Sequence, residues 1–128
     1  MFTDGWQRLL ARGHAEVVVE SVELTGSRGL ELLDVLYAGP DRKIGSIQVM
    51  SGFPSRHRAL GELTPVEGAS VPAGDMGLEL IIGLRVTRDG FAVRRGIRVH
   101  YRVWADALRC RLRVWDSGVP AGNSVRVV

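Results

Sequence analysis

The sequence predicts an all-β fold, an antiparallel β-sandwich, and three observations carry that prediction. Apolar and polar residues alternate with a period of two almost everywhere after residue 14. The alternating runs are short, and turn formers such as Gly39-Pro40 and Asp89-Gly90 separate them. Only residues 5–12 show helical spacing. About seven or eight strands are expected, which favours an immunoglobulin-like sandwich, with a small β-barrel as the alternative.

Each strand is assigned from its own alternation and its flanking turn residues. The first three runs are expected to form a meander, and residues 91–95 are expected to pair briefly before Gly96 permits a kink. Residues 5–12 are expected to form a short helix with Trp6, Leu9 and Leu10 on one side. The predicted strands are residues 17–24, 30–37, 44–50, 78–86, 97–104, 108–115 and a short edge strand at 125–128.

The segment from residue 51 to residue 75 is too rich in proline and glycine for one long element. Because a structureless loop of that length is rare inside a compact domain, we expect a short strand or helical turn near residues 58–63. Sandwiches use such segments to cross between sheets. A long connection is also a natural place for a binding loop.

Length and composition indicate one self-sufficient domain over residues 1–128, with residues 1–13 as a short helix or arm. The chain has 128 residues, of which 45% are hydrophobic and 24% charged, as in ordinary globular proteins. Cys110 is the only cysteine, so an intrachain disulfide is excluded, and its alternating context predicts a small buried side chain.

Neither a membrane-spanning run nor a signal peptide is found in the sequence. We therefore expect a cytoplasmic protein, or an extracytoplasmic one if the chain is a trimmed fragment of a longer protein. The net charge is +3, and Lys43 is the only lysine among seventeen cationic residues. Arginine favours carboxylate and phosphate partners because its planar group binds them in a bidentate manner.

The last predicted hairpin carries the candidate binding residues. A turn centred on Ala105-Asp106 would pair Val103 with Leu108 and Val99 with Leu112, which places apolar residues on the inward face. The outward face would then be rich in arginine and flanked by tryptophan. The predicted binding residues are Arg98, His100, Arg102, Arg109, Arg111 and Arg113, with Trp104 and Trp115 beside them.

In that register the cationic residues lie opposite one another, which is destabilising unless something offsets the repulsion. One explanation is carboxylates from neighbouring strands, for which Glu16, Glu20 and Glu23, or Glu79 beside Arg85, are available. The other is an external anion or an acidic patch on a protein partner. Arginine and tryptophan are both enriched at interface hot spots, whereas no nucleic-acid recognition motif is present, so nucleic acid is not expected.

Catalytic, metal-binding and cofactor-binding motifs are not found in the sequence, and none is predicted. The histidines are scattered, and Met50, His57, Met76 and His100 lack the close spacing of a copper site. We therefore expect a noncatalytic interaction module that binds a protein partner or itself through the last hairpin. The alternative is a small-molecule-binding β domain, enzymatic or not, with residues 51–75 as its lid.

The middle of the chain resembles uncharacterised actinobacterial β-sandwich proteins. Residues 63–74 match their L-x-P-x-x-G-x-x-[IV]-P-x-G turn, an apolar strand then ends in Gly83-Leu84, and Val99, Tyr101 and Val103 match their V-x-Y-x-V strand. The resemblance implies a sandwich fold and an extracytoplasmic, membrane-anchored setting, although this chain carries no anchor. The architecture is also similar to that of periplasmic copper chaperones, but the methionine and histidine spacing of their copper ligands is absent here. No functional residue is therefore carried over from either group.

Overall fold

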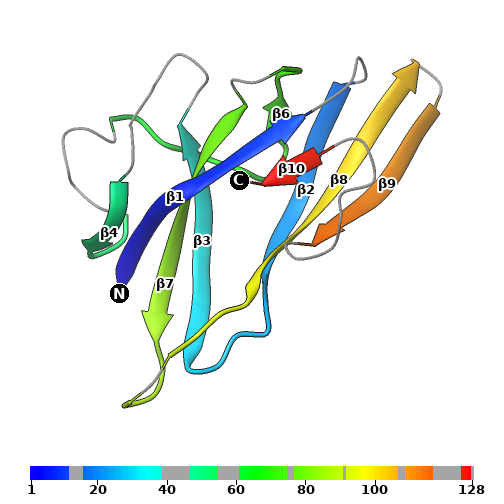
Figure 1. Cartoon of the computed structure of the whole chain (residues 1–128). Helices are drawn as coiled ribbons and strands as arrows, with labels where there is room; N and C mark the ends of the chain where they lie inside the picture. Colours follow the sequence, from blue (N-terminus) through cyan, green and yellow to red (C-terminus); the bar gives the residue numbers. More distant parts are fainter. Residues whose placement is uncertain are drawn as a thin grey trace.

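The computed structural model describes residues 1–11, 16–38, 47–54, 61–74, 77–90, 92–106, 109–116 and 125–127. At several strand positions, including all those from residue 104 onward, only the backbone is described. These residues form two antiparallel sheets that do not close into a barrel (Figure 1), so the predicted all-β sandwich is confirmed and its barrel alternative is not.

One sheet has six strands and the other has four. The six-stranded sheet has the order β10-β1-β7-β3-β5, with β4 also paired to β1, and its strands are β10 (Val125–Val127), β1 (Phe2–Ala11), β7 (Leu78–Val86), β3 (Leu30–Ala38), β5 (Thr64–Pro65) and β4 (Ile47–Ser51). The four-stranded sheet has the order β6-β2-β8-β9, and its strands are β6 (Ser70–Val71), β2 (Glu16–Thr25), β8 (Gly96–Asp106) and β9 (Arg109–Asp116).

A long antiparallel ribbon connects the two sheets. β2 pairs with β8 in one sheet and β3 pairs with β7 in the other, and the ribbon bends between them at the lower end of Figure 1. Backbone hydrogen bonds continue through the bend, where the Arg28 N–H donates to the Val93 carbonyl at 2.8 Å and the Val93 N–H donates back at 3.0 Å. Gly26, at φ 54°, supplies the left-handed residue that the bend requires.

The topology contradicts one prediction and does not confirm another. The first three runs do not form a meander, because β2 and β3 lie in different sheets and β4 pairs with β1. The immunoglobulin-like topology is also not confirmed. The pairing of β3 with β7 is nested inside the pairing of β2 with β8, whereas the two sheets of an immunoglobulin domain interleave their strands along the chain.

The predicted helix over residues 5–12 is wrong, because residues 2–11 form strand β1. β1 pairs with β7 along one edge and with β4 and β10 along the other. Two neighbours satisfy the backbone of this segment, while eight residues make only a marginal helix. Leu9, Leu10 and Ala11 are all buried, which is typical of a central strand covered on both faces.

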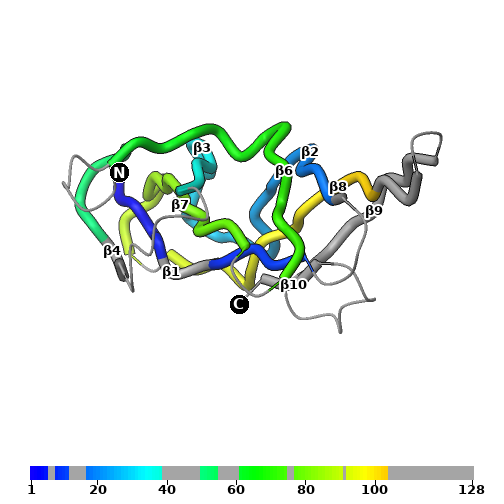
Figure 2. Tube along the Cα trace, turned by 90° about the horizontal axis from the view of Figure 1, so that it is seen from above, coloured from blue at the N-terminus to red at the C-terminus, as the bar shows by residue number. Residues whose placement is uncertain are grey.

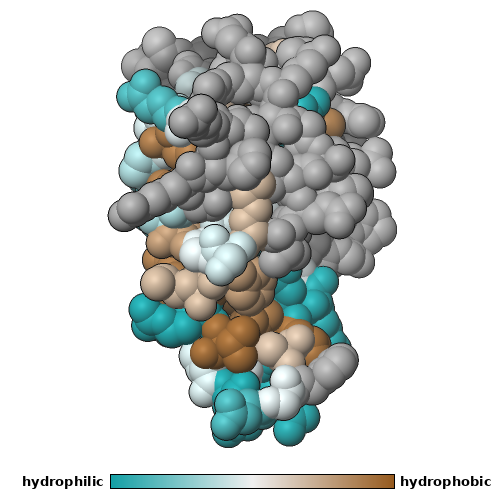
Figure 3. All heavy atoms as spheres, turned by 90° about the vertical axis from the view of Figure 1, so that its left-hand side faces the viewer, coloured by the Kyte–Doolittle hydropathy of each residue, from teal (hydrophilic) through white to brown (hydrophobic). Residues whose placement is uncertain are grey.

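The main core lies between the sheets and centres on β7. Leu80, Ile82 and Leu84 are at most 1% exposed, as predicted for one face of this strand, but Val86 at its end is 49% exposed. On the other face of β7, Ile81 is fully buried by a second cluster. The residues packed against Ile81 are Leu36, Met50, Phe53 and Leu63. Seen from that side, the lower half of the described surface mixes hydrophobic and hydrophilic residues (Figure 3).

The remaining predicted elements are largely confirmed. β2, β3, β7, β8, β9 and β10 agree with the predicted strands to within about two residues, and the brief pairing before Gly96 occurs as a bridge between Arg28 and Val93. Residues 44–46 of the predicted strand 44–50, and residues 58–60 of the short element expected near 58–63, lie outside the described residues. The predicted crossing between sheets is confirmed, because β5 pairs with β3 and β6 pairs with β2 (Figure 2).

Candidate functional site

The last hairpin has a different register from the predicted one. Tyr101 lies opposite Arg113 and Val103 lies opposite Arg111, a shift of three residues. The predicted turn is displaced because β8 continues to Asp106, with a register irregularity after Trp104. Because successive residues of a strand belong to opposite faces of the sheet, a shift by an odd number of residues pairs each residue with the other face of its partner strand. The predicted pairs Arg102–Arg109, His100–Arg111 and Arg98–Arg113, and the apolar pairs Val103–Leu108 and Val99–Leu112, are therefore wrong.

By register, Arg98, His100 and Arg102 of β8 do not lie opposite the arginines of β9. They lie opposite Asp116, Val114 and Leu112. The inward positions of β8 are as predicted, since Ile97, Val99 and Tyr101 are at most 2% exposed. For Trp104, Arg109, Arg111, Arg113 and Trp115 the structure describes the backbone alone, and the Cys110 side chain also lies outside the described part.

Carboxylates of β2 neutralise two arginines of β8. Arg98 Nη1 lies 3.0 Å from Glu23 Oε1, and Arg102 Nε lies 2.6 Å from Glu20 Oε1. His100 Nε2 lies 3.7 Å from the same Glu23 oxygen. The predicted role of Glu20 and Glu23 is thus confirmed, and we call these contacts the β2–β8 ion-pair ladder. Such exposed pairs contribute only about 0–1 kcal/mol each.

The predicted pairing of Glu79 with Arg85 is corrected. Glu79 instead accepts a 2.6 Å hydrogen bond from Arg8 of β1, and Arg85 lies 3.3 Å from Glu31 of β3. Both contacts connect neighbouring strands of the six-stranded sheet. These ion pairs therefore connect strands within the six-stranded sheet.

An ion pair that the sequence did not indicate lies on the core side of the six-stranded sheet. Arg94, in the connection from β7 to β8, contacts the carboxylate of Asp4 in β1. The two side chains are only 17% and 13% exposed. Asp4 lies opposite Ile82, whose side chain is in the core, and opposed residues of a ladder share a face. Arg94 Nη1 is buried without a hydrogen-bond partner among the described residues.

Residues 64–71, which we call the strap, cross the open side of the sandwich. After β5, the Val66 N–H donates to the Val35 carbonyl of β3 at 3.0 Å. Before β6, the Gly68 N–H donates to the Val19 carbonyl of β2 at 2.8 Å. The Ala69 N–H bonds back to the Val66 carbonyl and Gly68 has φ 79°, which is the geometry of a type II turn. The strap therefore joins the two sheets through their backbones.

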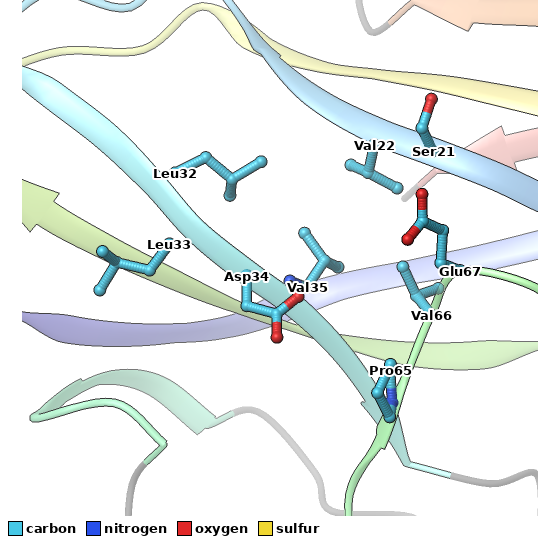
Figure 4. A pocket seen from close by; sticks show the side chains of 9 residues that line it. All are labelled: Ser21, Val22, Leu32, Leu33, Asp34, Val35, Pro65, Val66 and Glu67. Atoms are coloured by element: carbon cyan, nitrogen blue, oxygen red, sulfur yellow. Dashed lines mark hydrogen bonds between the residues drawn. The ribbon is translucent and has the colours of Figure 1, made fainter.

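A hollow of about 240 Å³ lies beside the strap, between β2 and β3, and we call it the slot. Val22, Leu32 and Val35 converge in it, and the carboxylate of Glu67 extends from the turn of the strap toward β2 (Figure 4). Asp34 lies at the β3 side. Small-molecule pockets usually measure about 300–1,000 Å³, so the slot is sized for a group no larger than a side chain.

The described residues contain no cluster of three or more His, Cys, Asp or Glu side chains that could hold a metal ion. Met50 packs against Ile81 in the second cluster, and His14, His57 and Met76 lie outside the described residues. Over the same residues, the structure has no helix that is long and apolar enough to cross a membrane.

The chain has no counterpart among the known proteins with which it was compared: no family model, no curated protein and no solved structure matches it. The fold and the site define the class as a two-sheet β-sandwich whose sheets are joined by the strap. Its resemblance to actinobacterial sandwich proteins stays a prediction from the sequence.

Proposed function

We propose that this domain is a noncatalytic interaction module that binds a protein partner along strand β9. The proposal keeps the last hairpin as the binding element but moves the contact from its face to its edge. The observation that carries it is the place of β9 in the four-stranded sheet. β9 is the last strand in the order β6-β2-β8-β9, and its described pairing is with β8 alone.

The charges of the neighbouring strand favour the edge over the face. Arg98 and Arg102 of β8 are already in contact with Glu23 and Glu20. An external anion would have to displace a carboxylate held in the same molecule, which makes the net binding of that anion weaker. The face of β8 is therefore a poor docking surface for an acidic partner.

A sheet edge binds an extended segment by adding it as a further strand, so that main-chain hydrogen bonds provide affinity and alternate side chains provide specificity. β9 spans Arg109–Asp116, and in its sequence arginine alternates with Cys110, Leu112 and Val114. A partner strand with carboxylates at alternate positions complements this pattern. A second copy of β9 fits less well, because it has no carboxylates at alternate positions, and half of the antiparallel registers place arginine opposite arginine.

The experiment measures binding of a short peptide that alternates valine and glutamate. We expect saturable binding that weakens with salt, and we expect the double reversal Arg109→Glu and Arg111→Glu to abolish it. The matched control reverses Arg28 and Arg88, which are exposed at the bend, and should leave the affinity unchanged. Equal loss in both double variants would show a nonspecific charge effect and would contradict the proposal.

A further inference from the structure

We propose that the slot is a binding site for a small amphipathic cation, an alkylguanidinium or alkylammonium group of side-chain size. The proposal is independent of strand β9, which lies at the other end of the four-stranded sheet. It rests on the cavity between β2 and β3, on the way the backbone keeps that cavity open, and on the combination of apolar and carboxylate groups around it.

The short partners of β2 and β3 leave the slot uncovered. β6 pairs only with Val17 and Val18 of β2, and β5 pairs only with Leu36 and Tyr37 of β3. Within the described residues, the parts of β2 and β3 that border the slot therefore have a neighbouring strand on one side only. The cavity opens at this uncovered side of the sandwich.

Both bordering strands carry a register irregularity at the slot. The pairing of β2 with β8 shifts between Val19 and Ser21, and the pairing of β3 with β7 shifts between Leu32 and Asp34. An irregularity of this kind redirects side chains and bends the strand, and it is common beside binding sites. Here it brings Val22 and Leu32 to the apolar side of the slot while Asp34 lies on the outer side of β3 (Figure 4).

Glu67 supplies the charge that selects the ligand. It occupies the first central position of the type II turn in the strap, and it is exposed although it lines the slot. No ion pair of Glu67 or Asp34 is found among the described residues, in contrast to Glu20 and Glu23 in the ion-pair ladder. A cation in the slot would place its alkyl part on Val22, Leu32 and Val35 and its charge beside Glu67.

The size of the cavity limits the ligand. At about 240 Å³ it accommodates one short alkyl chain with its charged end, but not a drug-sized molecule. A free alkylguanidinium and the arginine side chain of a protein present the same chemistry here. The two sources differ only in the backbone that follows the side chain, and the experiment separates them.

The test is a titration of the whole chain with n-butylguanidinium, followed through the methyl resonances of Val22, Leu32 and Val35. We expect saturable shifts at these methyls, and several-fold weaker binding of n-butylurea, which has a similar shape without the charge. Glu67→Gln should weaken binding about two- to fivefold, as expected for an exposed ion pair. The control Glu62→Gln makes the same charge change at an exposed residue outside the slot and should have no effect.

A second titration uses arginine blocked at both ends. If it binds at least as tightly as n-butylguanidinium, the natural ligand is a protein side chain, and if only the free cation binds, it is a small molecule. The proposal is overturned if neither probe binds, if n-butylurea binds equally well, or if Glu67→Gln and Glu62→Gln behave alike. Because these outcomes do not involve Arg109 or Arg111, they are independent of the test of strand β9.

Discussion

The aromatic ring of Phe53 lies directly against the backbone of Gly83. A Cβ atom built on Gly83 would come within 2.4 Å of Phe53 Cδ1. Glycine inside a strand marks a close approach of this kind. The contact joins the segment after β4 to the outer face of β7, where it helps to bury Ile81.

Gly83→Ala should destabilise the protein because the added methyl group overlaps the Phe53 ring. We expect a loss of about 1–3 kcal/mol in the free energy of unfolding, typical of overpacking. Urea denaturation measures it. In the background Phe53→Ala the same glycine substitution should cost much less, and an unchanged cost there would show that the ring is not the cause.

Gly77→Ala should destabilise the protein more than Gly68→Ala, although both glycines have positive φ. Gly77 has φ 56°, and its Cβ would lie 2.1 Å from the backbone oxygen of Leu9, whereas Gly68 has φ 79° with nothing within 4 Å. Both variants strain the backbone, but only one creates a clash. We expect Gly77→Ala to cost about 1–3 kcal/mol more than Gly68→Ala in thermal or urea denaturation. Equal costs would contradict the contact with Leu9.

Asp4→Ala should cost about 2–4 kcal/mol, because it leaves the guanidinium of Arg94 largely buried without its carboxylate. Asp4 makes a further interaction besides this pair, so a double-mutant cycle with Arg94→Ala isolates the ion pair. We expect the double variant to lose clearly less stability than the two single variants added together. Additive losses would show that the two side chains act separately.

The β2–β8 ion-pair ladder should contribute little to stability. Glu20 and Arg102 are 35% and 50% exposed, and pairs this exposed contribute about 0–1 kcal/mol. A double-mutant cycle with Glu20→Gln and Arg102→Gln measures the coupling, which should decrease as salt is added. A coupling as large as that of Asp4 with Arg94 would show that the ladder is a main support of the fold.

The strands were predictable from the sequence because alternation reports which residues face the core. Val99 and Tyr101 show this, since their burial follows directly from their spacing. β1 was not predictable in the same way. Leu9, Leu10 and Ala11 are buried in succession, and a strand covered on both faces loses the alternation that distinguishes it from a helix.

The candidate site was predicted less well because it depends on register and on long-range contacts. The later turn after Asp106 and the one-residue irregularity after Trp104 together move the hairpin three residues from the predicted register. No local signal in the sequence specifies such a shift. The pairing of Asp4 with Arg94 spans 90 positions. The slot likewise requires the strap to be placed against β2 and β3, although Pro65 and Gly68 did indicate a turn there.

The most direct test of the account is amide hydrogen exchange along β9, measured with and without the peptide that alternates valine and glutamate. An added strand bonds to those amides of β9 that are not bonded to β8, which are every second residue. We expect these amides to become protected on binding, and we expect a peptide that alternates valine and lysine to leave them unchanged. No new protection along Arg109–Asp116, or equal protection by both peptides, would contradict the account.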